Sequence, residues 1–377
     1  MKKVHITLVG GQPAAVYNGI VATAPDFVVF IYSASSKSLL ARVKNEISIP
    51  SRSVELDPTD PSKILAEVKS LAKSYANDEV TVNISSGLKS WSYFFGLVFA
   101  GEPNATVVYI DQNNILWNYK DMTCKPGLDI DMKTNFRLYG NSIEDCYRMF
   151  SDYTEEDRAC IEQIERAKQF QPRQFNYLTA LLDKPHQDYL NSHDMGSFQE
   201  SSGAFVEWER DRKNAIEHVK LVLVKGKTSL ETVLESKHAV EILFNTHWFE
   251  LKIASLLSRW DKAKEIIMNC KFQYKPNVDK NETDIIVNAG TKLLFVECKT
   301  QIAHTNDIDK FRSVVKGYGG MGSKGLFITE APMKDVARLK CEENGIIPFS
   351  LQDTHLLDTD KSLFLTLDAE LFNINTK

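Results

Sequence analysis

The sequence has little cysteine, no long apolar run and no excess of positive charge, and each shortage excludes a class of protein. Its six cysteines are scattered without Cys-x-x-Cys spacing, which argues against a zinc site or a disulfide framework and indicates reduced thiols in the cytoplasm. No apolar run reaches the length of a membrane span, and the N-terminus has no signal-peptide apolar region, so we expect no membrane contact. The net charge of −5 excludes a generally basic surface, so a nucleic-acid partner would need a local basic groove.

Two common nucleotide-binding motifs are also missing. The sequence contains neither G-x-G-x-x-G nor G-x-x-x-x-G-K-[S/T], so it gives little support to a dinucleotide site or a P-loop.

The length of 377 residues predicts two domains, and an apolar content of 43% is enough for a core in each. We expect a first domain over residues 1–140, a helical connector and linker over 141–235, and a second domain over 236–377.

The first domain alternates predicted strands and helices. This order predicts an α/β fold with a parallel sheet covered by helices on both faces. In such sheets ligands bind beyond the carboxyl ends of the strands, at the point where the strand order reverses. Strands are expected over residues 4–9, 27–32, 54–56, 80–84 and 106–110, and helices over 38–47, 61–75 and 90–100.

The loops after the first and fourth predicted strands are rich in small residues. Small side chains let backbone N–H groups approach an anion, and a helix N-terminus adds a favourable dipole. Ordinary strand-to-helix turns are also rich in Gly and Ser, so this pattern alone leaves both interpretations open. The candidate ligand-binding residues are Gly10, Gly11, Gln12, Ser85, Ser86, Gly87 and Lys89.

The second of these loops resembles the Asn-x-Thr-Gly-Gly-Thr-Lys motif of CRISPR-associated Rossmann-fold (CARF) sensor domains. Asn83, Gly87 and Lys89 match the motif. The resemblance covers about residues 1–140 and implies a Rossmann-like domain that binds a cyclic oligoadenylate at a dimer interface. The departures from the motif are Ser85 for Thr, Ser86 for the first Gly and Leu88 for the second Thr.

Residues 283–300 have the pattern of a β-hairpin that ends in charged side chains. Two runs rich in β-branched or aromatic residues flank a turn that contains Gly290. The strand period places Glu297 and Lys299 on one face, and in a hairpin of this length Asp284 can lie beside them. Two converging carboxylates repel each other unless a cation lies between them, and their oxygens suit Mg²⁺ or Mn²⁺. A solvated strand end with ordinary surface charges is the alternative interpretation.

The hairpin resembles the PD-(D/E)XK nuclease signature, with Asp284 followed by Glu297-x-Lys299. The resemblance implies that Asp284 and Glu297 hold a divalent ion together with the carbonyl of Cys298. It also implies that Lys299 orients or activates the attacking water, and that Glu250 holds a second ion or supports the first. The resemblance covers about residues 235–350 and rests on four elements in order: a helix over 237–258, the hairpin, a helix over 308–315 and a strand over 325–329. We also expect strands over 346–351 and 363–367.

The stretch between the two domains is polar and rich in residues that break regular structure. We predict a linker over residues 171–203 and a charged helix over 204–223. Arg212 and His218 in that helix are similar to the Arg-x4–6-His pattern of HEPN ribonucleases, which need no metal. Residues six apart do not share a face of a regular helix. The alternative interpretation is therefore that His218 is an exposed helix residue without a catalytic role.

An N-terminal sensor joined to a C-terminal nuclease resembles the ancillary nucleases of type III CRISPR systems. The resemblance implies a cytoplasmic homodimer in which cyclic tetraadenylate binds between two sensor domains and switches on metal-dependent cleavage of DNA or RNA. One alternative is a CARF-type regulator that binds nucleic acid without cleaving it, although a pure binder has no need of Asp284, Glu297 and Lys299 together. The other alternative is a metal-independent HEPN-type ribonuclease, whose activity would resist EDTA.

Overall fold

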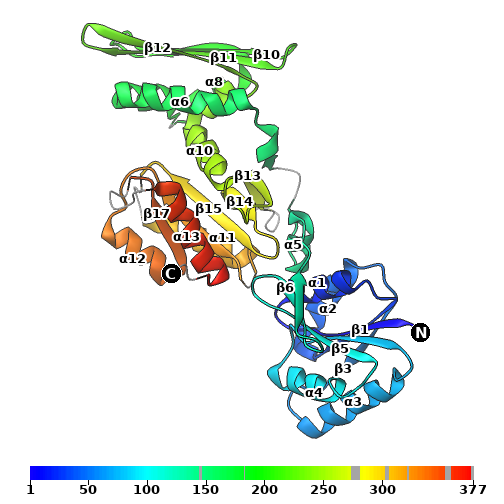
Figure 1. Ribbon diagram of the computed structural model, residues 1–377. Coiled ribbons are helices and arrows are strands. Elements are labelled where there is room, and N and C mark those ends of the chain that lie inside the picture. The colour runs from blue at the N-terminus through cyan, green and yellow to red at the C-terminus, as the bar shows by residue number, and fades with distance from the viewer. Residues whose placement is uncertain are drawn as a thin grey trace.

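Three sheets follow one another along an elongated molecule in the computed structural model (Figure 1). The N-terminal sheet lies at one end, a six-stranded sheet with its helices lies in the middle, and a four-stranded sheet lies at the other end. The chain therefore has the predicted α/β class, a Rossmann-like domain followed by a second α/β domain. No helix in the described part of the chain is long and apolar enough to cross a membrane. The structure describes residues 1–143, 147–181, 183–272, 281–301, 305–320, 322–352 and 358–374.

The N-terminal sheet has seven strands in the order β3-β2-β1-β4-β5-β6-β7. The strands from β3 to β5 in this order are parallel, and β6 and β7 are added antiparallel. The chain leaves β3 at one edge and returns as β4 on the other side of β1, so the strand order reverses between β1 and β4, as predicted. The strands are β1 (Lys3–Leu8), β2 (Phe27–Tyr32), β3 (Ser51–Glu55), β4 (Glu79–Asn83), β5 (Ala105–Ile110), β6 (Ile115–Asn118) and β7 (Thr123–Pro126).

Helices cover both faces of this sheet. Val28 points to the face covered by α1 and α2, whereas Val29 points to the face covered by α3 and α4. The Asp60 carboxylate caps α3, because it accepts hydrogen bonds from N–H groups of the first turn. Helix α1, which begins at Pro13, was not expected from the sequence. The helices are α1 (Pro13–Thr23), η1 (Ala34–Ser36), α2 (Lys37–Asn45), α3 (Pro61–Ser74) and α4 (Lys89–Phe99).

A short helix joins the cores of the two α/β domains. Helix α5 (Met132–Leu138) follows Asp131, whose carboxylate caps its first turn by accepting a hydrogen bond from the Thr134 N–H. Ile130 packs in the N-terminal core, whereas Phe136 packs against the six-stranded sheet. The two domains are therefore held together by buried contacts as well as by the chain itself.

The six-stranded sheet has the order β17-β16-β15-β14-β13-β8. Strands β14 and β15 form the predicted hairpin, and β16 lies parallel to β15 after the intervening helix α11. One face of the sheet packs against α11 and α12, and the other packs against α10 and α13. The elements are β8 (Arg148–Met149), β13 (Glu265–Phe272), β14 (Asn281–Asn288), β15 (Leu293–Lys299), α11 (Asn306–Tyr318), β16 (Lys324–Thr329), α12 (Asp335–Glu343) and β17 (Ile346–Ser350).

The stretch over residues 141–235, expected to be a helical connector and linker, is largely helical between Glu155 and Ser192, but its C-terminal part forms strands. This stretch contributes an antiparallel sheet in the order β12-β11-β10-β9, and the helix expected over 204–223 is two of its strands. Val219 and Leu221 are buried on alternate positions of β11, a strand period that the many charged residues obscured. The elements are η2 (Phe150–Asp152), α6 (Glu155–Phe170), α7 (Pro172–Thr179), α8 (Lys184–Ser192), β9 (Met195–Gln199), β10 (Phe205–Asp211), β11 (Ile216–Lys225) and β12 (Thr228–Ser236).

The prolines and the Arg-x5-His pair of this region have structural roles. Pro172 and Pro185 lie in the first turns of α7 and α8, where the missing N–H costs nothing. Arg212 lies in the turn after β10 and forms an ion pair with Asp194. His218 lies on β11 beside Glu235 of β12. Arg212 and His218 therefore do not lie on the helix that the HEPN interpretation assumed.

Two other predicted elements differ from the structure. The helix expected over residues 237–258 is interrupted, because Asn245 and Thr246 have φ angles of 58° and 67°. Residues 363–367, expected as a strand, belong to a helix whose buried leucines are spaced four apart, about one turn. The elements are α9 (Ala239–Leu243), η3 (Phe244–Thr246), α10 (His247–Leu257) and α13 (Thr359–Phe372).

Candidate nuclease centre and ligand-binding loops

The charged residues predicted at the open end of the β14–β15 hairpin meet there. Ile285 pairs with Val296, so one step further along the antiparallel register sets Asp284 opposite Glu297. The Lys299 Nζ lies 2.7 Å from Glu297 Oε1, on the same face of the strand. The Asp284 carboxylate accepts a hydrogen bond of 2.7 Å from the Cys298 backbone N–H, which fixes it across the hairpin.

The two carboxylates are in an environment that disfavours their charged forms. Burial, together with the charges of Glu297 and Glu250, raises the pKa of Asp284 well above its ordinary value. Burial also raises the pKa of Glu297, although the ammonium of Lys299 acts in the opposite direction. The pKa of Lys299 is itself raised, because the attraction of Asp284 and Glu297 outweighs the effect of burial. The carboxyl groups of Asp284, Glu297 and Glu250 therefore outnumber the single lysine beside them, and a cation would favour their ionised forms.

Glu250 approaches this centre from α10. Its side chain is nearly buried, with the residue 8% exposed. His247 Nδ1 lies 3.1 Å from Glu250 Oε2. Burial opposes protonation of His247, but the hydrogen bond and charge of Glu250 raise its pKa overall. The sequence analysis did not identify His247; the His-x-x-Glu spacing on a helix is the signal that would have found it.

The donor set fits a hard divalent cation. Burial raises the pKa of the Cys298 thiol well above its usual range, so a role for Cys298 falls to its carbonyl oxygen. Among the residues described, no three side chains of His, Cys, Asp or Glu are arranged to hold a metal ion. Mg²⁺ is commonly held by one or two carboxylates and completes its coordination with water. Asp284, Glu297 and the Cys298 carbonyl are compatible with that mode of binding.

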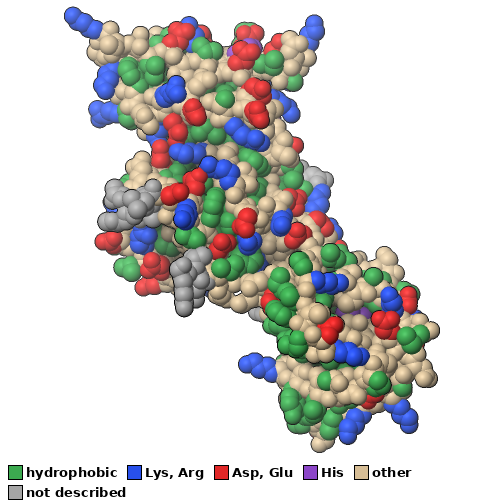
Figure 2. Space-filling model, in the orientation of Figure 1, with side chains coloured by type: hydrophobic (Ala, Val, Ile, Leu, Met, Phe, Trp, Pro, Cys, Tyr) green, Lys and Arg blue, Asp and Glu red, His purple; other side chains and the backbone are tan. Residues whose placement is uncertain are grey.

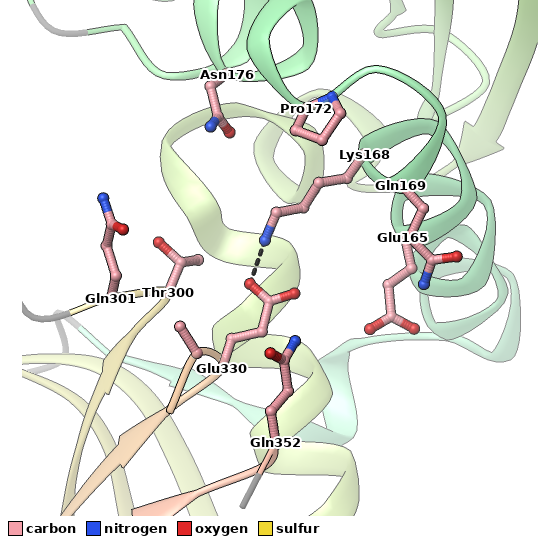
Figure 3. A pocket seen from close by; sticks show the side chains of 10 residues that line it. Glu165, Lys168, Gln169, Pro172, Asn176, Thr300, Gln301, Glu330 and Gln352 are labelled. Carbon is pink, nitrogen blue, oxygen red and sulfur yellow. Dashed lines mark hydrogen bonds and ion pairs between the residues drawn. The ribbon is translucent and has the colours of Figure 1, made fainter. Parts of the chain in front are cut away.

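A cleft of about 330 Å³ begins where β15 ends, one residue beyond Lys299 (Figure 3). It lies between the ends of strands β15 and β16 and helices α6 and α7. Lys168 extends from α6 across the cleft to form an ion pair with Glu330, and its ammonium lies 4.8 Å from the centroid of the Trp248 ring. No sequence pattern indicated these residues, because they come from segments that are far apart in the chain. The lining also includes Glu165, Pro172, Ala331 and five neutral polar side chains: Gln169, Asn176, Thr300, Gln301 and Gln352.

The two small-residue loops of the N-terminal domain also meet. A Cβ atom on Gly10 would lie 2.4 Å from the Gly87 nitrogen, so both backbones pass too close for a larger residue. Gly87 also has a φ of 86°, which favours glycine. The Gln12 N–H donates to the Ser86 hydroxyl over 3.4 Å. The structure thus brings Gly10, Gln12, Ser86 and Gly87 together at the reversal point of the sheet.

Of the remaining loop residues, some are hydrogen-bonded within the domain and others are exposed to solvent. The Ser85 hydroxyl accepts the Ile110 N–H over 2.7 Å and bonds to Asn83, so it is engaged within the loop. Asn83 in turn donates to the Ala15 carbonyl, over 3.2 Å, and ties the loop to α1. Gly11 and Lys89 are exposed, and Lys89 is the first residue of α4.

Comparison with known proteins establishes the fold. No family model and no curated protein matches the sequence. Can2 from Sulfobacillus thermosulfidooxidans, solved in complex with cyclic tetra-adenylate, is similar with a TM-score of 0.63 and 15% identity, over 98% of this chain and 99% of that chain. Protein VC1899 from Vibrio cholerae gives a TM-score of 0.70 and 15% identity over 98% of each chain. A type III CRISPR defence DNA nuclease activated by cyclic oligoadenylate gives 0.52 and 14% identity over 89% of this chain and 47% of that one. The fold of this chain is therefore one that occurs among proteins related to cyclic oligoadenylate and type III CRISPR defence.

Proposed function

We propose that the protein is a divalent-metal-dependent nuclease of type III CRISPR defence, activated by a cyclic oligoadenylate such as cyclic tetraadenylate. The observation that carries the proposal is the convergence of Asp284, Glu297 and Lys299 at one end of a hairpin. A pair of partly buried carboxylates is costly for the fold, and a catalytic cation explains it. The fold shared with proteins that bind cyclic tetra-adenylate, or are activated by cyclic oligoadenylate, supports the sensor half of the proposal.

In this proposal each residue of the nuclease centre has a separate task. Asp284, Glu297 and the Cys298 carbonyl would hold Mg²⁺ or Mn²⁺, which supplies charge stabilisation and a reactive water in phosphodiester hydrolysis. Lys299 orients the attacking water and donates to the negative charge that develops on the phosphate oxygens. Glu250, held by His247, supports the carboxylate cluster from α10.

The sensor half supplies anion-binding groups from two loops. Gly10 and Gly87 let the two loops pack closely against each other. Backbone N–H groups of these loops, with the exposed Gly11, would bind a phosphate, and Gln12 and Ser86 add polar side chains. Lys89 adds a full positive charge at the start of α4. Ser85 contributes through the conformation of the loop, because its hydroxyl is already bonded within it.

The exposed face of α4 favours a homodimer. Lys89, Tyr93 and Leu97 are spaced four apart and so share one face of the helix. Tyr93 is 63% exposed and Leu97 is 57% exposed, and Figure 2 shows hydrophobic side chains gathered on the surface over α4. A second copy covering this face would remove the apolar surface from water and bring two copies of Lys89 near one interface.

The direct test is cleavage of supercoiled plasmid, single-stranded DNA and single-stranded RNA. Each substrate is incubated with Mg²⁺ or Mn²⁺, with and without cyclic tetraadenylate, and with an EDTA control. We expect cleavage only when metal and activator are both present, and a loss of at least about 100-fold in Glu297→Gln. Activator binding without cleavage of any substrate would instead indicate a ligand-sensing regulator, and cleavage that resists EDTA would exclude the metal centre.

A further inference from the structure

A second cavity lies between the two α/β domains. It has a volume of about 430 Å³. The N-terminal domain contributes the start of α1, including Gln12 and Ala14, and the residues at the end of β5. The second domain contributes Lys292 from the hairpin turn, Lys324 from the start of β16, and the end of α13. The cavity therefore touches both the candidate ligand loops and the hairpin that carries the nuclease centre.

Lys292 places an incompletely compensated positive charge in this cavity. Its ammonium donates to the Leu371 carbonyl and lies 4.6 Å from the centroid of the Phe372 ring, but in the described part of the chain it forms no ion pair with a carboxylate. Burial lowers the pKa of Lys292, and the charge of Lys324 lowers it further, although Asp111 acts in the opposite direction. A half-buried ammonium in this position would be stabilised by an anion.

The two acidic residues of the cavity are already engaged. Asp111 accepts backbone hydrogen bonds in its own turn and a bond of 3.0 Å from the indole N–H of Trp117. Glu370 forms an ion pair of 3.0 Å with Lys324. Among the described residues neither carboxylate forms a hydrogen bond or an ion pair with Lys292, although the charge of Asp111 raises the pKa of Lys292.

The opposite wall offers neutral donors to the same anion. Helix α1 has no side-chain cap at Gln12, and Gln12, Ala14 and Ala15 at its start line the cavity. The dipole at a helix N-terminus favours an anion there. Gln112 and Asn373 line the cavity and bond to each other over 3.0 Å across the domain boundary. Donors thus converge from both domains on one space.

We propose that this cavity binds a phosphate group between the start of α1 and Lys292. The phosphate comes either from the activator held by the neighbouring loops, in which case the inference rests on the proposed function, or from a separate phosphorylated ligand. Lys292 directly precedes β15, and β15 carries Glu297 and Lys299. A phosphate bound here would therefore fix the sensor loops against the hairpin of the nuclease centre.

The test compares Lys292→Met with wild type in the full-length protein. Cyclic tetraadenylate is titrated by calorimetry, and inorganic phosphate is titrated by ³¹P nuclear magnetic resonance. Lys292→Arg keeps the charge, and Lys227→Met removes an exposed lysine from the β11–β12 turn as a matched control. We expect Lys292→Met to weaken binding of at least one probe by roughly tenfold or more, and both controls to stay near wild type.

Each outcome has a definite meaning. Weaker binding of cyclic tetraadenylate assigns the phosphate to the activator, whereas loss of inorganic phosphate binding alone assigns it to a separate ligand. Wild-type affinity of Lys292→Met for both probes overturns the inference, as does wild-type protein that binds neither probe. If the wild type binds inorganic phosphate through Lys292 but not cyclic tetraadenylate, the cavity assignment stands and the proposed activator is wrong.

Discussion

The ionised carboxylate of Asp284 lowers the stability of the folded protein when no cation is bound beside it. Because its pKa is raised in the folded protein, the ionised carboxylate destabilises the fold at pH values above that pKa. A neutral side chain of the same shape removes this cost and keeps an oxygen to accept the Cys298 N–H. The same substitution removes a ligand of the proposed metal ion.

We therefore expect Asp284→Asn to raise the metal-free unfolding temperature at pH 8 by roughly 2–4 °C. The rise that Mg²⁺ or Mn²⁺ produces in wild type should be absent from this variant. Thermal unfolding with EDTA and with each metal measures both effects, and Asp261→Asn, at an exposed carboxylate, is the control. A metal-induced rise of wild-type size in Asp284→Asn would remove Asp284 from the site.

Lys299 is expected to act in the chemical step and not in activator binding. Lys299→Met should lower the cleavage rate by about 100-fold or more, because the orienting contact and the positive charge are both lost. Its affinity for cyclic tetraadenylate should equal that of wild type in a calorimetric titration. A single-turnover cleavage assay checks the rate, and an unchanged rate would assign water positioning to another group.

Helix α6 depends on a single buried carboxylate at its start. Asp157 accepts hydrogen bonds from the Thr154 N–H, over 2.8 Å, and from the His238 N–H, over 3.0 Å, so it links α6 to the segment before α9. Burial opposes ionisation of Asp157, but the hydrogen bonds from His238, Thr154 and Ser236 lower its pKa to about 2. The ionised carboxylate therefore stabilises the fold above its unfolded pKa of about 4, and this contribution is lost as the pH falls toward 2.

Asp157→Asn should destabilise the protein by about 2 kcal/mol at pH 7 and by almost nothing near pH 2. Unfolding temperatures of wild type and variant, measured from pH 7 downward, should converge in the acid range. Asp183→Asn, which alters the exposed cap of α8, should have a smaller effect at pH 7. A difference that persists undiminished at pH 2 would contradict the assigned role of the carboxylate.

At the level of the whole molecule, the proposed homodimer depends on the exposed face of α4. Tyr93→Glu combined with Leu97→Glu should give a monomer in light scattering, because a dimer would bury four like charges. The double variant should bind cyclic tetraadenylate at least about tenfold more weakly, while its Mg²⁺-induced rise in unfolding temperature stays that of wild type.

The matched control for the dimer lies on the second domain. Val336 and Leu339 on α12 are 71% and 57% exposed, so charging both of them changes an equally exposed apolar pair at another place. Val336→Glu with Leu339→Glu should remain a dimer. If this control dissociates and the α4 variant does not, the interface lies on α12 instead.

Local patterns predicted the elements that carry the candidate sites. The β14–β15 hairpin and the alternating strands and helices of the first domain follow from patterns among residues that are close in the sequence. The strand β11 was mistaken for helix because its buried face is narrow and the surrounding charges mask its two-residue period. Residues 363–367 were expected as a strand and are helical. A short apolar run is compatible with either element, and the surface against which it packs decides between them.

Strand period and turn chemistry act over short distances, so local sequence was enough to predict which residues end the hairpin and which loops follow β1 and β4. The folded arrangement was needed to show that Glu250 reaches the carboxylate pair, that Lys168 faces Glu330 across the cleft, and that Lys292 shares a cavity with Gln12. Those contacts join segments far apart in the chain, and they are set by how whole layers pack. Close packing of the sheets and helices fixes such distances, and no local pattern contains them.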